Sequence, residues 1–148
     1  MTDRVDFYVL KSSTAAQRWT FACRLTEKAY LLDLRVVVWS DTAADAKLMD
    51  ELLWTFNERS FVPHTVTGVA SDDTAPVQLT PDLDSVAKAD LLVNLSRRMP
   101  GGLERFSRIA EILDADDERR RLGRARFKAY RDLKLLLETH QMDEAADA

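Results

Sequence analysis

Residues 35–39 read R-V-V-V-W, and this short run decides the fold class. β-Branched and aromatic side chains fit a pleated strand, and an unbroken apolar run is typical of a strand buried on both faces of a parallel sheet. Apolar residues recur at helical spacing in residues 15–31 before this run and in residues 42–54 after it. The chain is therefore expected to enter this strand from one helix and to leave it through another.

Further strand-like segments extend this alternation. Residues 5–10 (V-D-F-Y-V-L) are rich in strand formers, and residues 91–95 (L-L-V-N-L) form a second buried run. Residues 60–81 carry Pro, Gly and Asp and are expected to be mostly loop, with a short strand at residues 77–79. Strands that alternate with helices predict a mainly parallel sheet covered on both faces, which is an α/β sandwich.

Two helices are predicted after the P-G-G turn at residues 100–102. Phe106, Ile109 and Ile112 recur at helical spacing and indicate the first of them. The second helix is basic and is expected to end near Leu137.

The chain has 148 residues, the size of one domain that buries its own core. The sequence shows no repeats, and we expect one domain at residues 1–140. Residues 141–148 are acidic and small, so a disordered tail is expected there.

Composition favours a soluble globular protein, with 46% hydrophobic and 31% charged residues. No apolar run is long enough to cross a membrane, and residues 1–4 do not lead into a signal-type segment, so a cytoplasmic location is expected. The single cysteine, Cys23, excludes an internal disulfide framework and is expected to be a small core residue. His64 and His140 have no partner at metal-ligand spacing, so no metal site is expected.

The sequence carries no pattern that indicates an enzyme. The turn after the first strand, K-S-S-T at residues 11–14, is not a glycine-rich phosphate loop, and the chain has only four glycines. No arrangement of Ser, His and Asp or of Cys and His can be argued for nucleophilic catalysis. We therefore expect neither catalysis nor a cofactor.

Residues 119–131, R-R-R-L-G-R-A-R-F-K-A-Y-R, carry the strongest functional signal. At ~100° per residue, one helix face gathers an aromatic ring and four cations: Arg120, Arg124, Phe127, Lys128 and Arg131. The opposite face gathers the small and apolar residues that are expected to pack on the core: Leu122, Ala125, Ala129, Leu133 and Leu136. This pattern predicts an exposed site for a negatively charged partner with an apolar element.

A solvated basic face is the alternative interpretation of this helix. The acidic residues just before it, Asp114, Asp116, Asp117 and Glu118, are explained by charge complementarity at a helix N-terminus. Because the net charge of the chain is −4, a short acidic peptide fits the basic run better than a long phosphate backbone does. Direct binding of single-stranded nucleic acid by the basic helix remains the competing function.

Three large aromatic residues at the end of the second helix and after it form another candidate site. Trp54, Phe56 and Phe61 can form a hydrophobic docking surface for a second protein. Alternatively, they cap the sheet.

Seven stretches, in order along nearly the whole chain, resemble one known family. They are D-F-Y-V-L at 6–10, E-K-A-Y at 27–30, D-E-L-L-W at 50–54, S-F-V-P-H at 60–64, A-P-V-Q-L at 75–79, D-L-L-V-N-L-S at 90–96 and R-F-K-A-Y-R at 126–131. The family is the chi subunit of bacterial DNA polymerase III holoenzyme, an accessory protein of the clamp-loader complex. S-F-V-P-H and R-F-K-A-Y-R together make a fairly specific signature.

The resemblance implies a Rossmann-like, three-layer α/β fold without nucleotide chemistry. It also implies a linking function, because chi-like proteins bind the acidic, phenylalanine-terminated C-terminal tail of single-stranded DNA-binding protein. By position this site falls on Arg124, Phe127 and Lys128, with Arg120 and Leu113 as neighbours. The family often has Tyr where this chain has Phe127. With Phe127, the hydroxyl contact is missing and the ring contact remains.

The resemblance also bears on the aromatic residues. The surface around Trp54 and Phe61 is similar to the region through which chi-like proteins join a psi-like clamp-loader subunit or a repair helicase. Which of these two partners docks there is left open. Contact with DNA is expected to be indirect.

Overall fold

The computed structural model describes residues 2–12, 14–57, 59, 61–66 and 75–142. The strands are β1 (Arg4–Leu10), β2 (Val36–Trp39), β3 (His64–Val66), β4 (Val77–Thr80), β5 (Ala89–Asn94), β6 (Phe106–Leu113) and β7 (Leu136–Met142). The helices are α1 (Ala15–Leu31), α2 (Ala43–Thr55) and α3 (Asp117–Asp132), with the short 3₁₀ turns η1 (Leu83–Ser85) and η2 (Leu103–Arg105). Within the described residues, no helix combines the length and the apolar character needed to span a bilayer.

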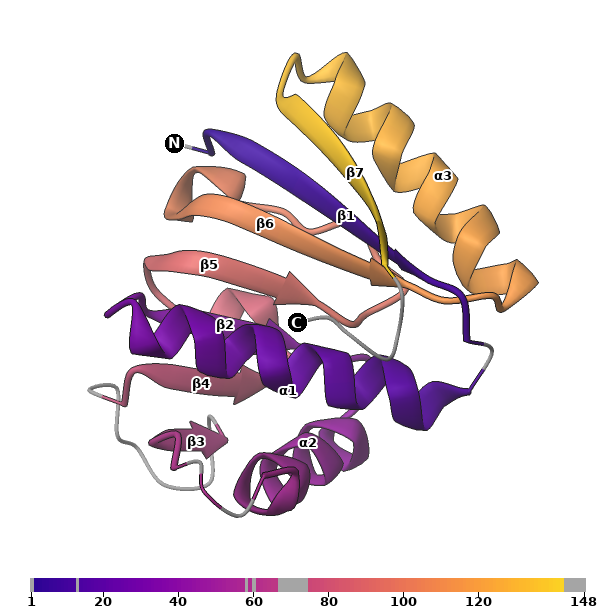
Figure 1. The fold of residues 1–148 in the computed structure, drawn as a ribbon. Helices are drawn as coiled ribbons and strands as arrows, with labels where there is room; N and C mark the ends of the chain where they lie inside the picture. Colours follow the sequence, from indigo (N-terminus) through magenta and orange to yellow (C-terminus); the bar gives the residue numbers. More distant parts are fainter. Residues whose placement is uncertain (1, 13, 58, 60, 67–74, 143–148) are drawn as a thin grey trace.

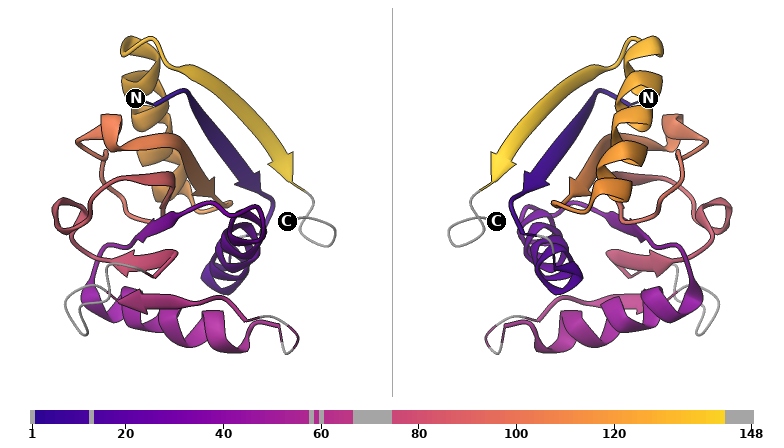
Figure 2. Two further views of the ribbon diagram at one scale, coloured as in Figure 1. Left: turned by 90° about the vertical axis from the view of Figure 1, so that its left-hand side faces the viewer. Right: turned by 90° about the vertical axis from the view of Figure 1, so that its right-hand side faces the viewer.

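The seven strands form one sheet in the order β3-β4-β2-β5-β6-β1-β7, and every neighbouring pair is parallel (Figure 1). The helices cover both faces, with α1 and α3 on opposite sides of the sheet (Figure 2). This arrangement confirms the predicted single α/β sandwich of three layers with a parallel sheet.

Two apolar cores fill the space between the layers. Strand residues such as Val36 and Val38 pack under α1 and α2, whereas Val37 and Trp39 of the same strand face the other side. The buried run in β2 therefore serves both cores, as its composition predicts. Cys23 lies in the first core, where its Sγ is 3.8 Å from Sδ of Met49, and burial raises the pKa of the thiol to about 12. The prediction of a small core residue is confirmed.

The helix predicted through Phe106, Ile109 and Ile112 is wrong, because these residues belong to strand β6. β6 lies between β5 and β1, and residues 109–113 are all buried. A strand covered on both faces loses its alternation of apolar and polar residues, so its spacing can imitate that of a helix.

The basic helix is shorter than predicted. α3 ends at Asp132, and Lys134, with a φ of 62°, turns the chain back into β7. β7 pairs with β1 and includes Gln141 and Met142, which the sequence assigned to the acidic tail. Residues 143–148 lie outside the described residues.

Candidate functional site

Helix α3 begins with the acidic cap that the sequence indicates. Oδ2 of Asp116 accepts a hydrogen bond of 2.8 Å from the backbone N–H of Arg119, and Asp117 and Glu118 lie in the first turn. Negative charge at this end of a helix is favourable. Asp114 has a different role, because its buried carboxylate forms two hydrogen bonds with the guanidinium of Arg119, at 2.9 and 2.7 Å.

The face of α3 that packs on the sheet differs from the predicted one. The buried residues of the helix are Gly123, Arg126 and Tyr130. Of the residues predicted to pack on the core, Ala125, Leu133 and Leu136 are exposed, and Leu122 and Ala129 are half-buried. At ~100° per residue, the helix is turned by roughly 90° from the predicted orientation.

A buried polar cluster explains this rotation. Glu111 of β6 is fully buried and accepts hydrogen bonds from Tyr130 Oη at 2.6 Å, Arg126 Nε at 3.0 Å and Asn94 Nδ2 at 3.0 Å. Burial raises the pKa of Glu111 above its ordinary value, against the opposing effect of Arg126. A pattern of apolar residues cannot reveal this anchor, because its members are polar or charged.

Close contact between α3 and β6 depends on Gly123. A Cβ at this position would lie 2.6 Å from Cδ1 of Leu113, which is itself buried. Leu113, a predicted neighbour of the partner site, therefore lies beneath the helix.

Phe127 is half-buried, whereas the sequence predicts an exposed ring. Its ring meets that of Phe7 edge-on, with 5.2 Å between the centroids, and it packs beside the second core. The residue as a whole remains partly accessible. Arg124 and Arg131 precede and follow it by three and four residues, the spacing of side-chain neighbours on a helix.

The basic residues of α3 fall into two groups. One group is already engaged: Arg119, Arg121 and Arg126 form ion pairs with Asp114, Glu118 and Glu111, and Nε of Arg120 donates to the carbonyl oxygen of Asp114 at 2.7 Å. The other group is Arg124, Lys128 and Arg131, which are exposed and form no ion pair within the part of the chain that the structure describes. We call Arg124, Phe127, Lys128 and Arg131 the basic strip.

Two of the three candidate aromatic residues come together. Trp54 is 47% exposed and Phe61 is 66% exposed, and their ring centroids are 5.3 Å apart. Trp54 also lies against His64, whose Nε2 is 3.0 Å from Oδ1 of Asp50. We call Trp54 and Phe61 the aromatic pair.

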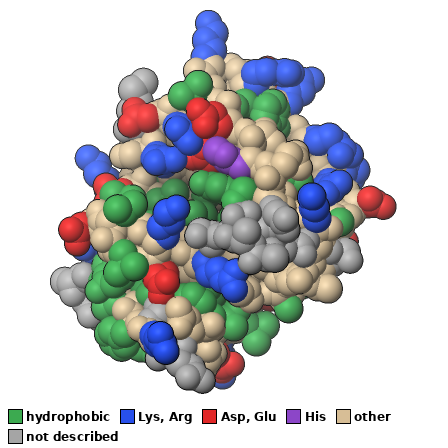
Figure 3. Space-filling model, in the orientation of Figure 1, with side chains coloured by type: hydrophobic (Ala, Val, Ile, Leu, Met, Phe, Trp, Pro, Cys, Tyr) green, Lys and Arg blue, Asp and Glu red, His purple; other side chains and the backbone are tan. Residues whose placement is uncertain are grey.

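Phe56 does not join the aromatic pair. It is half-buried and lines a hollow where α1 and α2 end, together with Leu31 and Leu32. Both leucines are largely exposed, and hydrophobic side chains are visible on this face of the molecule (Figure 3). The sequence does not predict this apolar surface, because both leucines continue the apolar pattern of α1.

His140 has a structural partner that its place near the C-terminus did not suggest. Its Nε2 lies 2.9 Å from Oδ1 of buried Asp6, which also binds Arg4 and Arg108. Ligand atoms of Asp6, Glu138 and His140 lie within 4.8 Å of one another, the spacing of a possible metal site. Since two arginines already hold the Asp6 carboxylate, this group is best explained as an ion-pair network.

The sequence is similar to that of one known protein family over nearly its whole length. Residues 1–138 match the family described as DNA polymerase III chi subunit, HolC. The chain is 34% identical over 139 residues to DNA polymerase III subunit chi of Pseudomonas aeruginosa, covering 94% of this chain and 96% of that protein. It is 27% identical over 130 residues to the subunit of the same name in Escherichia coli, covering 84% and 88%.

The fold itself is shared more widely. A chain in a solved complex of Saccharomyces cerevisiae Dbp5 with Nup159 and Gle1 superposes with a TM-score of 0.63 at 11% identity. The match covers 93% of this chain and 41% of that one. At this level of identity, the likeness concerns the fold alone.

Proposed function

The chain belongs to the family of DNA polymerase III chi subunits, which are accessory subunits in DNA replication, and from that premise we propose that it links the clamp-loader complex to single-stranded DNA-binding protein. The link is made by binding the acidic C-terminal tail of that protein. The subunit itself carries out no catalysis.

The observation that carries this proposal is the set of exposed cations beside a half-buried ring, none of which forms an ion pair with another described residue. Arg124, Lys128 and Arg131 can neutralise the acidic side chains and the terminal carboxylate of the tail, while Phe127 offers an apolar contact to its final phenylalanine. A charge-assisted hydrogen bond contributes roughly 1.5–3 kcal/mol. Two or three of them with one buried ring reach about −8 kcal/mol after the cost of association, which is micromolar affinity.

The aromatic pair supports a second docking surface in the same function. Trp54 and Phe61 are exposed and in contact, and aromatic residues dominate binding energy at protein interfaces. A psi-like clamp-loader subunit or a repair helicase would dock there. Phe56, which lies apart from the pair, contributes less.

The test is a calorimetric titration with a synthetic peptide that ends in an acidic stretch and a phenylalanine. Arg124→Ala should weaken binding about tenfold. Arg121→Ala is the matched control, because Arg121 lies on the same helix but is paired with Glu118.

A competition arm separates this function from direct nucleic-acid binding. An oligothymidylate should bind weakly and fail to displace the peptide at physiological salt. If the oligonucleotide displaces the peptide and its affinity falls steeply with salt, the basic strip is a nucleic-acid site instead.

A further inference from the structure

A small polar pocket opens at the carboxyl ends of β2, β5 and β6, between the starts of α2 and α3. Its volume is about 110 Å³. The charged residues that line it are Arg18, Asp41, Asp45, Arg97, Arg119 and Arg126. In open parallel sheets, ligands bind outside the carboxyl ends of the strands. We call this site the arginine pocket.

Arg18 is a buried charge in the pocket. It is only 6% exposed, and its guanidinium donates to two backbone carbonyls, from Nε to Ile112 at 2.8 Å and from Nη2 to Leu95 at 3.2 Å. No carboxylate within the described residues forms an ion pair with it. A buried charge without a counter-ion is costly. Burial, together with the nearby charge of Arg119, lowers the pKa of Arg18 to about 10.

The other arginines keep donors available toward the same space. Arg119 binds Asp114 through Nε and Nη2, so its Nη1 stays available. Arg126 donates from Nε to Glu111 and from Nη1 to the carbonyl of Arg97, so its Nη2 stays available. A guanidinium has five N–H donors, so neither side chain is saturated by these contacts.

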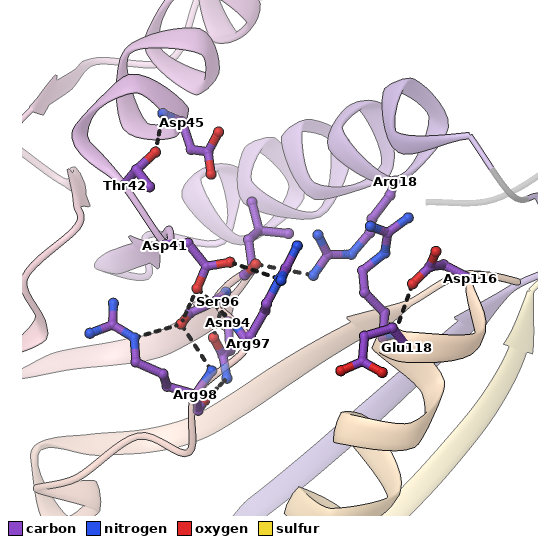
Figure 4. Close-up of polar contacts among 12 residues, drawn as sticks. Arg18, Asp41, Thr42, Asp45, Asn94, Ser96, Arg97, Arg98, Asp116 and Glu118 are labelled. Atoms are coloured by element: carbon purple, nitrogen blue, oxygen red, sulfur yellow. Dashed lines mark hydrogen bonds and ion pairs between the residues drawn. The ribbon is translucent and has the colours of Figure 1, made fainter.

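Arg97 is held loosely at the mouth of the pocket. Its side chain is 65% exposed, and its Nε is 3.6 Å from Oδ2 of Asp41. Figure 4 shows Arg18 and Arg97 extending into the same space from α1 and from the loop after β5. Asp41 is fixed by Ser96 and by the backbone N–H of Arg97, both at 2.9 Å, so it serves to hold the loop in place.

We propose that the arginine pocket binds inorganic phosphate, which keeps at least one P–OH group at neutral pH, whereas a phosphate monoester, with a second pKa of about 6, has mostly lost it. The pocket has room for one tetrahedral oxyanion, since a water molecule takes ~30 Å³ in the liquid. Arg18 and its neighbours contact the anionic oxygens. Asp45, on the α2 side, accepts the hydrogen of the P–OH group, because a carboxylate can only accept.

This geometry makes the pocket selective against sulfate. Sulfate has the same shape as phosphate and carries no proton at neutral pH, so it would set an unprotonated oxygen against Asp45. The basic strip makes no such distinction, since none of its residues is a carboxylate.

The experiment titrates the full chain with sodium phosphate at constant ionic strength, followed by calorimetry and by the NMR signals of the arginine Nε–H groups. We expect saturable binding that shifts the Arg18 signal, with sulfate binding about tenfold more weakly. Arg18→Gln should weaken phosphate binding about tenfold, because it removes the charge and keeps an N–H donor. Arg121→Ala, outside the pocket, should leave binding unchanged.

Arg97→Ala provides the test if Arg18→Gln does not fold, because the exposed Arg97 side chain can be removed with little cost to the fold. It should weaken phosphate binding several-fold, and Phe127→Ala should not. A 5′-phosphorylated oligothymidylate should bind no more tightly than the same oligonucleotide without the phosphate, because its monoester has mostly lost the P–OH hydrogen at neutral pH. Signals that drift without saturating, sulfate that binds as tightly as phosphate, or an unchanged affinity in Arg97→Ala would overturn the proposal.

Discussion

Tyr130 donates a hydrogen bond of 2.6 Å from its hydroxyl to Oε2 of Glu111, and both side chains are fully buried. The contact joins α3 to β6 beneath the helix. Arg126 holds the other oxygen of the same carboxylate at 3.0 Å. These bonds fix the rotation of α3 about its axis and so determine which of its residues face outward.

Tyr130→Phe should destabilise the protein by about 1–3 kcal/mol, because a buried carboxylate oxygen loses its closest donor. Urea unfolding at neutral pH measures the loss. Tyr30→Phe is the control, since the Tyr30 hydroxyl has no hydrogen-bond partner among the residues described, and it should cost less than ~0.5 kcal/mol. Equal losses in the two variants would show that the bond to Glu111 adds little.

Phe127→Ala should weaken binding of the acidic tail peptide at least about tenfold without unfolding the protein. The ring is only half-buried, so its removal leaves most of the second core in place. Phe127→Tyr keeps the ring and should retain the affinity. Calorimetric titration of both variants decides, and an unchanged affinity in Phe127→Ala refutes the site.

Trp54→Ala should leave tail-peptide binding intact and abolish copurification with a clamp-loader or helicase partner. Trp54 lies at the end of α2, whereas the basic strip lies on α3, and the two helices cover different parts of the sheet. Affinity purification and peptide titration of the same variant test this independence. Loss of both activities together would mean that the two surfaces are coupled.

Gly123→Ala should destabilise the protein by about 1–3 kcal/mol, although the same change inside an exposed helix usually stabilises it. The new Cβ would meet Cδ1 of Leu113 at 2.6 Å, and Leu113 is packed in the second core. Combining Gly123→Ala with Leu113→Ala should cost less than the sum of the single changes, because the smaller side chain relieves the clash. Thermal unfolding of the three variants measures this coupling.

Stability should fall in acid partly through Asp6. Burial opposes the ionised carboxylate, but hydrogen bonds from Arg4, Arg108 and His140 outweigh burial and hold the pKa of Asp6 below its ordinary value. The ion pairs therefore stabilise the fold above the pKa of an unfolded aspartate, about 3.9, and this contribution is lost as pH falls through the lower folded value.

Arg108→Ala tests this assignment by urea unfolding at pH 7 and at pH 3. The variant should be less stable than the wild type at pH 7, and the difference should shrink at pH 3. In an Asp6→Asn background, Arg108→Ala should give the same small difference at both pH values. A difference that persists unchanged at pH 3 would assign the effect of Arg108 to packing.

The sequence predicts the fold class because its decisive signals are local. The buried run in β2 and the helical spacing in α1 and α2 give the alternation of strands and helices, and the structure confirms them. The sequence predicts a helix where β6 lies, because a strand covered on both faces has no alternation of apolar and polar residues. β7 was hidden for another reason: its pairing with β1 is a long-range contact that no local pattern encodes.

The candidate site was predictable only in part. The charges and the ring of the basic strip lie on one helix stripe, which follows from helical geometry alone. Which arginines form ion pairs depends on the carboxylates of Asp114, Glu111 and Glu118. Glu111 lies in β6 and Asp114 follows it directly, so both lie outside the helical pattern. Arg18 gave no signal either, because a single arginine in an amphipathic helix is ordinarily a surface residue.

The place of β1 between β6 and β7 has a consequence for how the protein is made. Arg4 pairs with Arg108 on one side and with Leu136 on the other, so both neighbours of β1 are synthesised long after it. Until both are made, β1 has no strand to pair with, and the sheet closes through contacts between segments that are far apart in the sequence. A chain truncated before β7 would therefore leave one edge of β1 unpaired.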